Sequence, residues 1–94
     1  MDLRQTVPGG LSRVRSARRL LNECPFPRGE HHDLADPPAT FATLRWETGD
    51  EEVSTVVLEW WHTRAAGWMA RVRVTDPRLM TGAVWIPAAD VRPR

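Results

Sequence analysis

The second half of the chain is built from short runs in which apolar and polar residues alternate. Trp68, Ala70, Val72 and Val74 fall on one side of an extended chain, and the residues between them fall on the other side. A period of two is typical of a β-strand with one buried face. The periodicity therefore predicts a β-sheet in this half of the chain.

Three further runs have the same β character. Residues 41–47 alternate in the same way, residues 53–62 are rich in β-branched side chains, and residues 83–86 form a short apolar run that Pro87 ends. The turns between these runs are short, which favours an antiparallel meander. Because so small a sheet must curl to bury a core, we expect a small antiparallel barrel of four or five short strands. Residues 88–91 suit one tight turn near its end.

Residues 41–93 resemble an SH3-like barrel. The resemblance rests on Gly67-Trp68-Met69-Ala70-Arg71 and on Gly82-Ala83-Val84-Trp85-Ile86-Pro87-Ala88-Ala89-Asp90-Val91. These segments are similar to the family's W-W-x-A-R strand and to its G-x-[aromatic]-[IF]-P-x-x-Y-V motif. The resemblance implies a barrel that the second motif closes, with a one-turn 3₁₀ helix after the proline.

The resemblance does not extend to the peptide-binding positions of the family. Gly67 stands where those members carry a surface tryptophan, Asp90 stands where they carry a tyrosine, and the chain has no tyrosine at all. A groove for a PxxP peptide stacks prolines between aromatic side chains. We therefore do not expect binding of a proline-rich PxxP peptide.

The first forty residues follow a different pattern. Residues 1–10 end in Pro-Gly-Gly, which predicts a flexible lead-in. Residues 11–24 place Val14, Ala17 and Leu21 on one stripe of an amphipathic helix, and residues 25–40 form a proline-rich arm before a barrel of residues 41–94. The outer face of the helix is basic, with Arg13, Arg15, Arg18 and Arg19.

Composition limits the classes of protein to which the chain can belong. Its 94 residues suit one domain, and no apolar run approaches the roughly 18 residues that a membrane span needs. The arginine-containing start lacks the apolar stretch of a secretory signal. A single cysteine, Cys24, cannot form an internal disulfide, so we expect a cytoplasmic protein with no membrane contact.

The charge of the chain is polarised. The net charge is +1, but residues 1–30 carry +3, residues 31–52 carry −5 and residues 53–94 carry +3. A nucleic-acid-binding protein is expected to be more uniformly basic. All thirteen positive side chains are arginine, which suits a GC-rich bacterial genome and also gives side chains that stack on aromatic rings.

The sequence carries no pattern typical of an enzyme or of a cofactor site. It has no glycine-rich phosphate loop and no paired carboxylates at a defined spacing, so we expect neither catalytic residues nor a cofactor. Cys24, His31, His32 and Asp33 lie in the proline-rich arm without the spacing of a zinc module. We expect this segment to be a solvated loop rather than a metal site.

The hairpin around Ala65-Ala66-Gly67 predicts which side chains share a face. A three-residue loop pairs Arg64 with Trp68, and a longer loop pairs Trp61 with Met69. Both registers keep the same faces. We expect an inward face with these members: Leu44, Trp46, Val56, Leu58, Trp60, Trp68, Val72, Val74, Val84 and Ile86.

The outward face predicts the candidate site. Tryptophan, methionine and arginine are enriched in protein interfaces, and the outward set contains Trp61, Met69, Arg71, Arg73 and Trp85. We expect a non-enzymatic binding or adaptor module that uses this face for a protein partner or for self-association. Two alternatives stay open. The helix stripe or Phe26 covers Trp61 and Trp85 as a second small core, or the outer face and the basic helix bind single-stranded nucleic acid.

Overall fold

The computed structural model describes residues 20–94. The predicted lead-in and most of the predicted helix, including Arg13, Arg15, Arg18 and Arg19, lie outside the described residues. The strands are β1 (Ala39–Trp46), β2 (Gly49–Thr63), β3 (Gly67–Arg73), β4 (Ala83–Pro87) and β5 (Val91–Pro93), with a 3₁₀ helix at Ala88–Asp90. No helix in residues 20–94 has the length and apolar character that crossing a bilayer requires.

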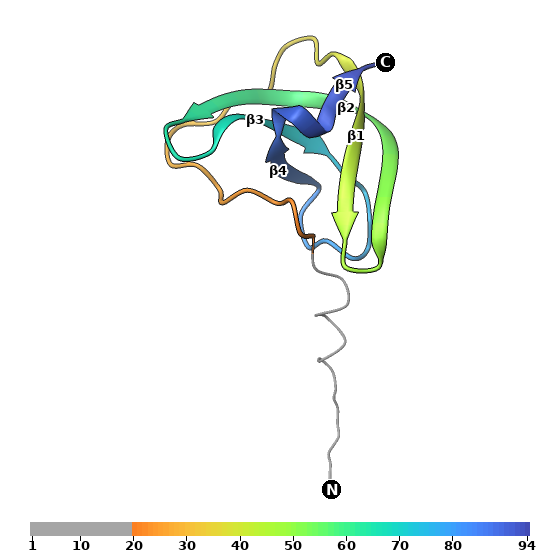
Figure 1. The fold of residues 1–94 in the computed structure, drawn as a ribbon. Coiled ribbons are helices and arrows are strands. Elements are labelled where there is room, and N and C mark those ends of the chain that lie inside the picture. Colours follow the sequence, from red (N-terminus) through yellow and green to blue (C-terminus); the bar gives the residue numbers. More distant parts are fainter. Residues whose placement is uncertain (1–19) are drawn as a thin grey trace, which may run out of the picture.

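All strand pairs are antiparallel, and they form one sheet of order β4-β3-β2-β1-β5. The prediction of a mainly β, antiparallel domain is confirmed. The two edge strands, β4 and β5, are joined by the 3₁₀ helix but share no ladder, so the sheet is not closed into the predicted barrel (Figure 1). The carbonyl of Trp85 in β4 accepts a hydrogen bond from the Cys24 amide at 2.8 Å, so an earlier segment bonds to this strand instead of β5.

Strand β2 spans both halves of the sheet (Figure 1). Its first part pairs with β1, from Trp46 opposite Gly49 to Ala39 opposite Val56. Its second part pairs with β3, and the register shifts between Val57 and Glu59. One extra residue in a strand reverses the alternation beyond it, so the bulge places Val57 and Trp60 on the same side. Strict alternation makes no allowance for a bulge, so it predicts Val56 and Leu58 on this side in place of Val57. Leu58 is buried as predicted, although outside the main core cluster, whereas Val56 is only half-buried.

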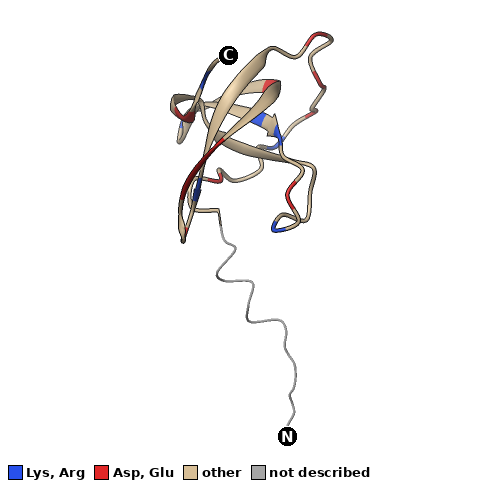
Figure 2. Ribbon diagram, turned by 90° about the vertical axis from the view of Figure 1, so that its right-hand side faces the viewer, with Lys and Arg blue, Asp and Glu red and all other residues tan. Residues whose placement is uncertain are grey.

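The acidic run Asp50-Glu51-Glu52 belongs to β2 and not to the predicted turn. Only Glu47 and Thr48 form the turn, and Gly49 follows with a φ of +135° that favours glycine. Glu51 and Glu52 then pair with Leu44 and Thr43 of β1. Figure 2 shows these acids as a red stretch of the ribbon. The turn is shorter than predicted because ladder hydrogen bonds continue almost to the tip of the hairpin.

The core lies inside the curl of the sheet. The predicted inward residues Leu44, Trp46, Val72, Val74, Val84 and Ile86 are all buried, together with Leu20, Ala42, Val57 and Ala70. Arg78 from the loop after β3 stacks on the ring of Trp46, with its guanidinium carbon 3.8 Å from the ring centroid. The same arginine bonds to Asp76 and Glu51, so this loop closes one end of the core.

The end of the predicted helix, residues 20–24, is not helical. Leu20 forms a β-bridge with Trp46, and the Leu21 amide donates to the carbonyl of Arg45 at 2.6 Å. The side-chain amide of Asn22 donates to the carbonyl of Thr43 at 2.9 Å. These tertiary hydrogen bonds replace the helical ones. Leu20 is therefore buried, while Leu21, predicted on the buried stripe, is exposed.

Replacing Leu44 by alanine should lower the free energy of unfolding by about 2–5 kcal/mol, because the site is fully buried and cannot collapse around the smaller side chain. Urea denaturation followed by circular dichroism measures this loss. Met80→Ala is the control, because Met80 is fully exposed, and it should change stability by less than about 0.5 kcal/mol. Equal effects of the two substitutions would contradict the core assignment.

Candidate functional site

The outer side of strands β2, β3 and β4 carries a second aromatic cluster. Trp61 and Trp85 lie edge to face with ring centroids 6.3 Å apart, and the His31 ring lies 4.4 Å from Trp61 and 5.3 Å from Trp85. Phe26 adds an edge contact to His31 at 5.1 Å and to Trp85 at 6.4 Å. We call Phe26, His31, Trp61 and Trp85 the outer aromatic cluster.

Residues 24–34, which we call the covering arm, lie over this cluster. The arm is fixed at both ends by backbone hydrogen bonds, from the Cys24 amide to Trp85 and from the Leu34 amide to the carbonyl of Leu58 at 2.7 Å. Gly29 in its middle has a φ of +131°. A Cβ at Gly29 would meet the Trp61 ring at 2.8 Å. The arm therefore passes so close to Trp61 that only glycine fits.

A chain of charged side chains joins the arm to the sheet. The Nδ1 atom of His31 lies 3.1 Å from Oε2 of Glu59, and Nε2 lies 2.7 Å from the carbonyl oxygen of Pro27. Arg71 donates to Oε1 of Glu59 through Nε at 3.1 Å and through Nη2 at 2.9 Å. Arg71 also donates to Asp33 of the arm at 2.6 Å. Glu59 is buried, and these two cationic partners compensate its charge.

His31 titrates differently from an exposed histidine. The hydrogen bond to the Pro27 carbonyl raises its pKa, and the Glu59 carboxylate raises it further. Burial and the positive charge of Arg71 lower the pKa of His31, but the two acceptors outweigh them. The arm therefore favours the protonated form of this imidazole.

Because the covering arm lies over part of it, the face that was predicted to be exposed is largely buried. Met69 and Trp85 are only 1% and 2% exposed, and Trp61 is half-buried, so the expected exposure of this face is wrong. The alternative of a second small core is closer to the structure. His31 of the arm forms most of this layer, while Phe26 adds edge contacts and stays 72% exposed. The expected solvated loop is wrong at His31, because its side chain is 12% exposed. Partner binding through these residues stays a prediction.

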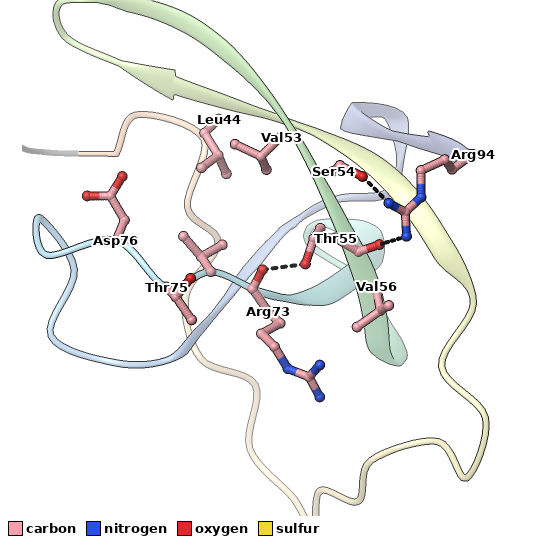
Figure 3. Close-up of a pocket in the computed structure, with 10 residues that line it drawn as sticks. Leu44, Val53, Ser54, Thr55, Val56, Arg73, Thr75, Asp76 and Arg94 are labelled. Carbon is pink, nitrogen blue, oxygen red and sulfur yellow. Dashed lines mark hydrogen bonds between the residues drawn. The ribbon is translucent and has the colours of Figure 1, made fainter.

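Arg73 lies apart from the other predicted site residues. It lines a cavity of about 330 Å³ where β2 passes from β1 to β3. Figure 3 shows the Arg94 side chain lying against β2, where it donates to the hydroxyl of Ser54 and to the carbonyl of Thr55. The cavity is open to solvent, and Asp76 lines its other side. Arg71 and Arg73 therefore do not act on one surface.

The largest exposed aromatic side chains are those predicted to be inside. Trp60 and Trp68 are 41% and 57% exposed, and we call them the exposed tryptophan pair. They share the inward face with Ala70, because Trp60 pairs with Ala70 and His62 with Trp68. The expected burial is wrong because the β2–β3 hairpin extends beyond the core. The Trp68 ring packs on His62 with centroids 5.1 Å apart.

A small cavity lies next to Trp60. Its volume is about 140 Å³, and it is bordered by Val57, Val91 and a segment of prolines and short side chains. The full lining is Pro38, Ala39, Thr40, Val57, Trp60, Val91, Arg92 and Pro93. Trp60 thus forms one wall of an apolar depression between β2 and β5. No group of three or more His, Cys, Asp or Glu side chains in residues 20–94 is placed to hold a metal ion.

Comparisons of the chain with models of protein families, with curated proteins and with solved structures found no match.

Replacing Gly29 by alanine should release the covering arm, because the new methyl group collides with Trp61. Gly49→Ala is a matched control, since Gly49 has nearly the same φ, +135°, but a Cβ at that position would meet no atom within 4 Å. Both variants share a backbone strain of about 1–3 kcal/mol. Amide hydrogen exchange at Cys24 and Leu34 should accelerate by at least about tenfold only in Gly29→Ala. The same acceleration in both variants would show that the collision has no role.

Proposed function

We propose that the chain is a non-enzymatic binding module that holds a protein partner through the exposed tryptophan pair. The observation that carries the proposal is that Trp60 and Trp68 stand 41% and 57% exposed on one face of one hairpin. Tryptophan is among the residues that contribute most to binding energy when a partner removes them from water. A chain with a thin core gains stability by burying such side chains, so their exposure together points to an external contact.

The shape of the surface beside Trp60 supports a protein rather than a small molecule as its ligand. The cavity beside Trp60 has a volume of about 140 Å³. Sites for drug-sized ligands usually have volumes of about 300–1,000 Å³, so this depression suits one side chain of a partner. Trp68 and His62 extend the contact along the hairpin. A partner that inserts one apolar side chain beside Trp60 and lies across Trp68 fits this arrangement.

The proposed fold type is an open variant of the SH3-like arrangement. The one-turn 3₁₀ helix at Ala88–Asp90 follows Pro87, where the resemblance implies one. Five antiparallel strands in one curled sheet also support this assignment, although β4 and β5 do not pair with each other. A fold of this type does not by itself define a ligand. The binding proposal therefore rests on the tryptophans.

Binding of nucleic acid is the second candidate, and the uncovered arginines Arg73 and Arg94 favour it. Phosphate contacts need arginines that are free of carboxylates. Arg45, Arg71 and Arg92 in the sheet and Arg78 in the loop after β3 are instead paired with acids. The acidic start of β2 adds negative charge to the same domain. These ion pairs make the protein partner the better-supported candidate.

Alanine substitution of Trp60 and of Trp68 should each weaken binding of a purified partner by at least about tenfold, the loss expected for a hot-spot residue. The partner is first identified by cross-linking in the native host and is then titrated by calorimetry. Met80→Ala and Leu21→Ala remove apolar side chains elsewhere that are at least as exposed, and they should change Kd by less than about twofold. Circular dichroism confirms that each variant is folded.

Salt dependence distinguishes a protein partner from nucleic acid, and light scattering detects self-association. A protein contact through tryptophans should weaken little with salt, whereas a nucleic-acid contact should weaken steeply in proportion to the phosphates neutralised. A dimer that Trp60→Ala dissociates would identify a second copy of the chain as the partner. Unchanged affinity and unchanged oligomeric state in both tryptophan variants would refute the proposal.

A further inference from the structure

We propose that the covering arm is a pH-responsive cover over Trp61 and Trp85, and that protonated His31 holds the arm against the sheet. The proposal concerns the outer side of the sheet and does not depend on the exposed tryptophan pair. It rests on the hydrogen-bond geometry of His31, on the charge balance around it, and on the two backbone hydrogen bonds that fix the ends of the arm.

The hydrogen-bond geometry favours the imidazolium form. Both ring nitrogens of His31 face acceptors, the Glu59 carboxylate at 3.1 Å and the Pro27 carbonyl at 2.7 Å. A neutral imidazole has one N–H donor and one lone-pair acceptor. It can satisfy only one of these partners and must turn a lone pair towards the other oxygen. The imidazolium donates to both, so the closed geometry selects the protonated ring.

The charges around His31 also favour its protonated form. Strand β2 contributes Glu59, strand β3 contributes Arg71, and the arm contributes Asp33, which bonds to Arg71. Strand β4 contributes no charged group to the His31 ring, only Trp85. With His31 protonated, two cations balance two anions. With His31 neutral, one negative charge is left uncompensated beside two tryptophans, and the buried Glu59 loses a partner.

Within residues 20–94, backbone hydrogen bonds join the arm to the sheet only at its ends, so between them its position depends on side-chain contacts such as those of His31. Two backbone hydrogen bonds fix its ends, at Cys24 and Leu34. Trp85 Nε1 is buried without a hydrogen-bond partner among residues 20–94, and an unsatisfied buried donor costs about 1–3 kcal/mol. Opening the arm would let water reach this N–H group. A segment that has two backbone hydrogen bonds to lose and one N–H group to hydrate can open locally without unfolding of the whole domain.

The direction of the pH effect follows from the raised pKa of His31. A group whose pKa is raised in the closed state stabilises that state fully below the pKa of the free group, which for histidine is about 6.5. The stabilisation is lost as pH rises through the pKa of the closed state. The arm is therefore closed in mildly acidic solution and opens as the solution becomes alkaline. Opening uncovers Trp61 and Trp85.

The test compares wild type, His31→Gln and His32→Gln from about pH 5 to about pH 8.5, the range in which imidazoles titrate. His32 is the matched control because it is adjacent to His31 but 77% exposed. Hydrogen exchange at the Cys24 and Leu34 amides, corrected for its intrinsic pH dependence, reports the state of the arm. Ring ¹⁵N shifts report the protonation of each histidine.

In wild type and in His32→Gln, protection of these two amides should fall by at least about tenfold across the titration of His31. In His31→Gln, protection should be low throughout and independent of pH. A His31 midpoint at or below about 6.5 would overturn the proposal, since the closed arm would then not favour protonation. Retained pH dependence in His31→Gln would overturn it as well. The midpoint is measured on wild type, so it decides the question even if His31→Gln does not fold.

Discussion

The rest of the structure depends on one irregularity in strand β2. This strand runs through both halves of the sheet, and its register shifts between Val57 and Glu59. Without the bulge, strict alternation would place Val57 and Glu59 on one face, and the carboxylate would enter the core. With it, Val57 faces the core, while Glu59 turns to the outer side and meets Arg71 and His31. One extra residue therefore separates an apolar core from a charged and aromatic outer layer.

Alternation in the sequence is sufficient to predict the sheet and most of its core. Leu44, Val72 and Ile86 are buried where a period of two places them, because strands β1, β3 and β4 are regular. The bulge has no residue signature in β2, so the pattern could not predict the face of Val56 and Leu58. Alternation also fails to predict burial where both faces are covered. Trp85 lies on the predicted outer side, yet it is as buried as its neighbours Val84 and Ile86.

The contacts of the arm could not be predicted from local sequence. His31 and His32 are adjacent and chemically identical, but one is 12% exposed and the other 77%. Their difference comes from Glu59 and Trp61, which lie about thirty positions further along the chain. Only Gly29 marks the segment locally, and a glycine in a proline-rich loop has many ordinary explanations. The same limit applies at residues 20–24. Their periodicity predicts a helix, but they form hydrogen bonds with β1 instead.

The adjacent residues Trp60 and Trp61 show why a covered and an open aromatic surface coexist in so small a domain. Neighbouring positions on a strand face opposite sides, so the hairpin presents tryptophan on both. A chain of this length cannot enclose both sides with its core alone.

On the outer side the arm supplies the missing layer, and glycine at position 29 allows it to approach Trp61 closely. On the other side the hairpin extends beyond the core, and Trp60 and Trp68 stay 41% and 57% exposed. The arm already occupies the outer surface, so a partner would have to compete with it there but not at the exposed tryptophan pair. We therefore propose Trp60 and Trp68 as the surface that is always open to a partner, and Trp61 and Trp85 as a surface whose exposure depends on the protonation of His31.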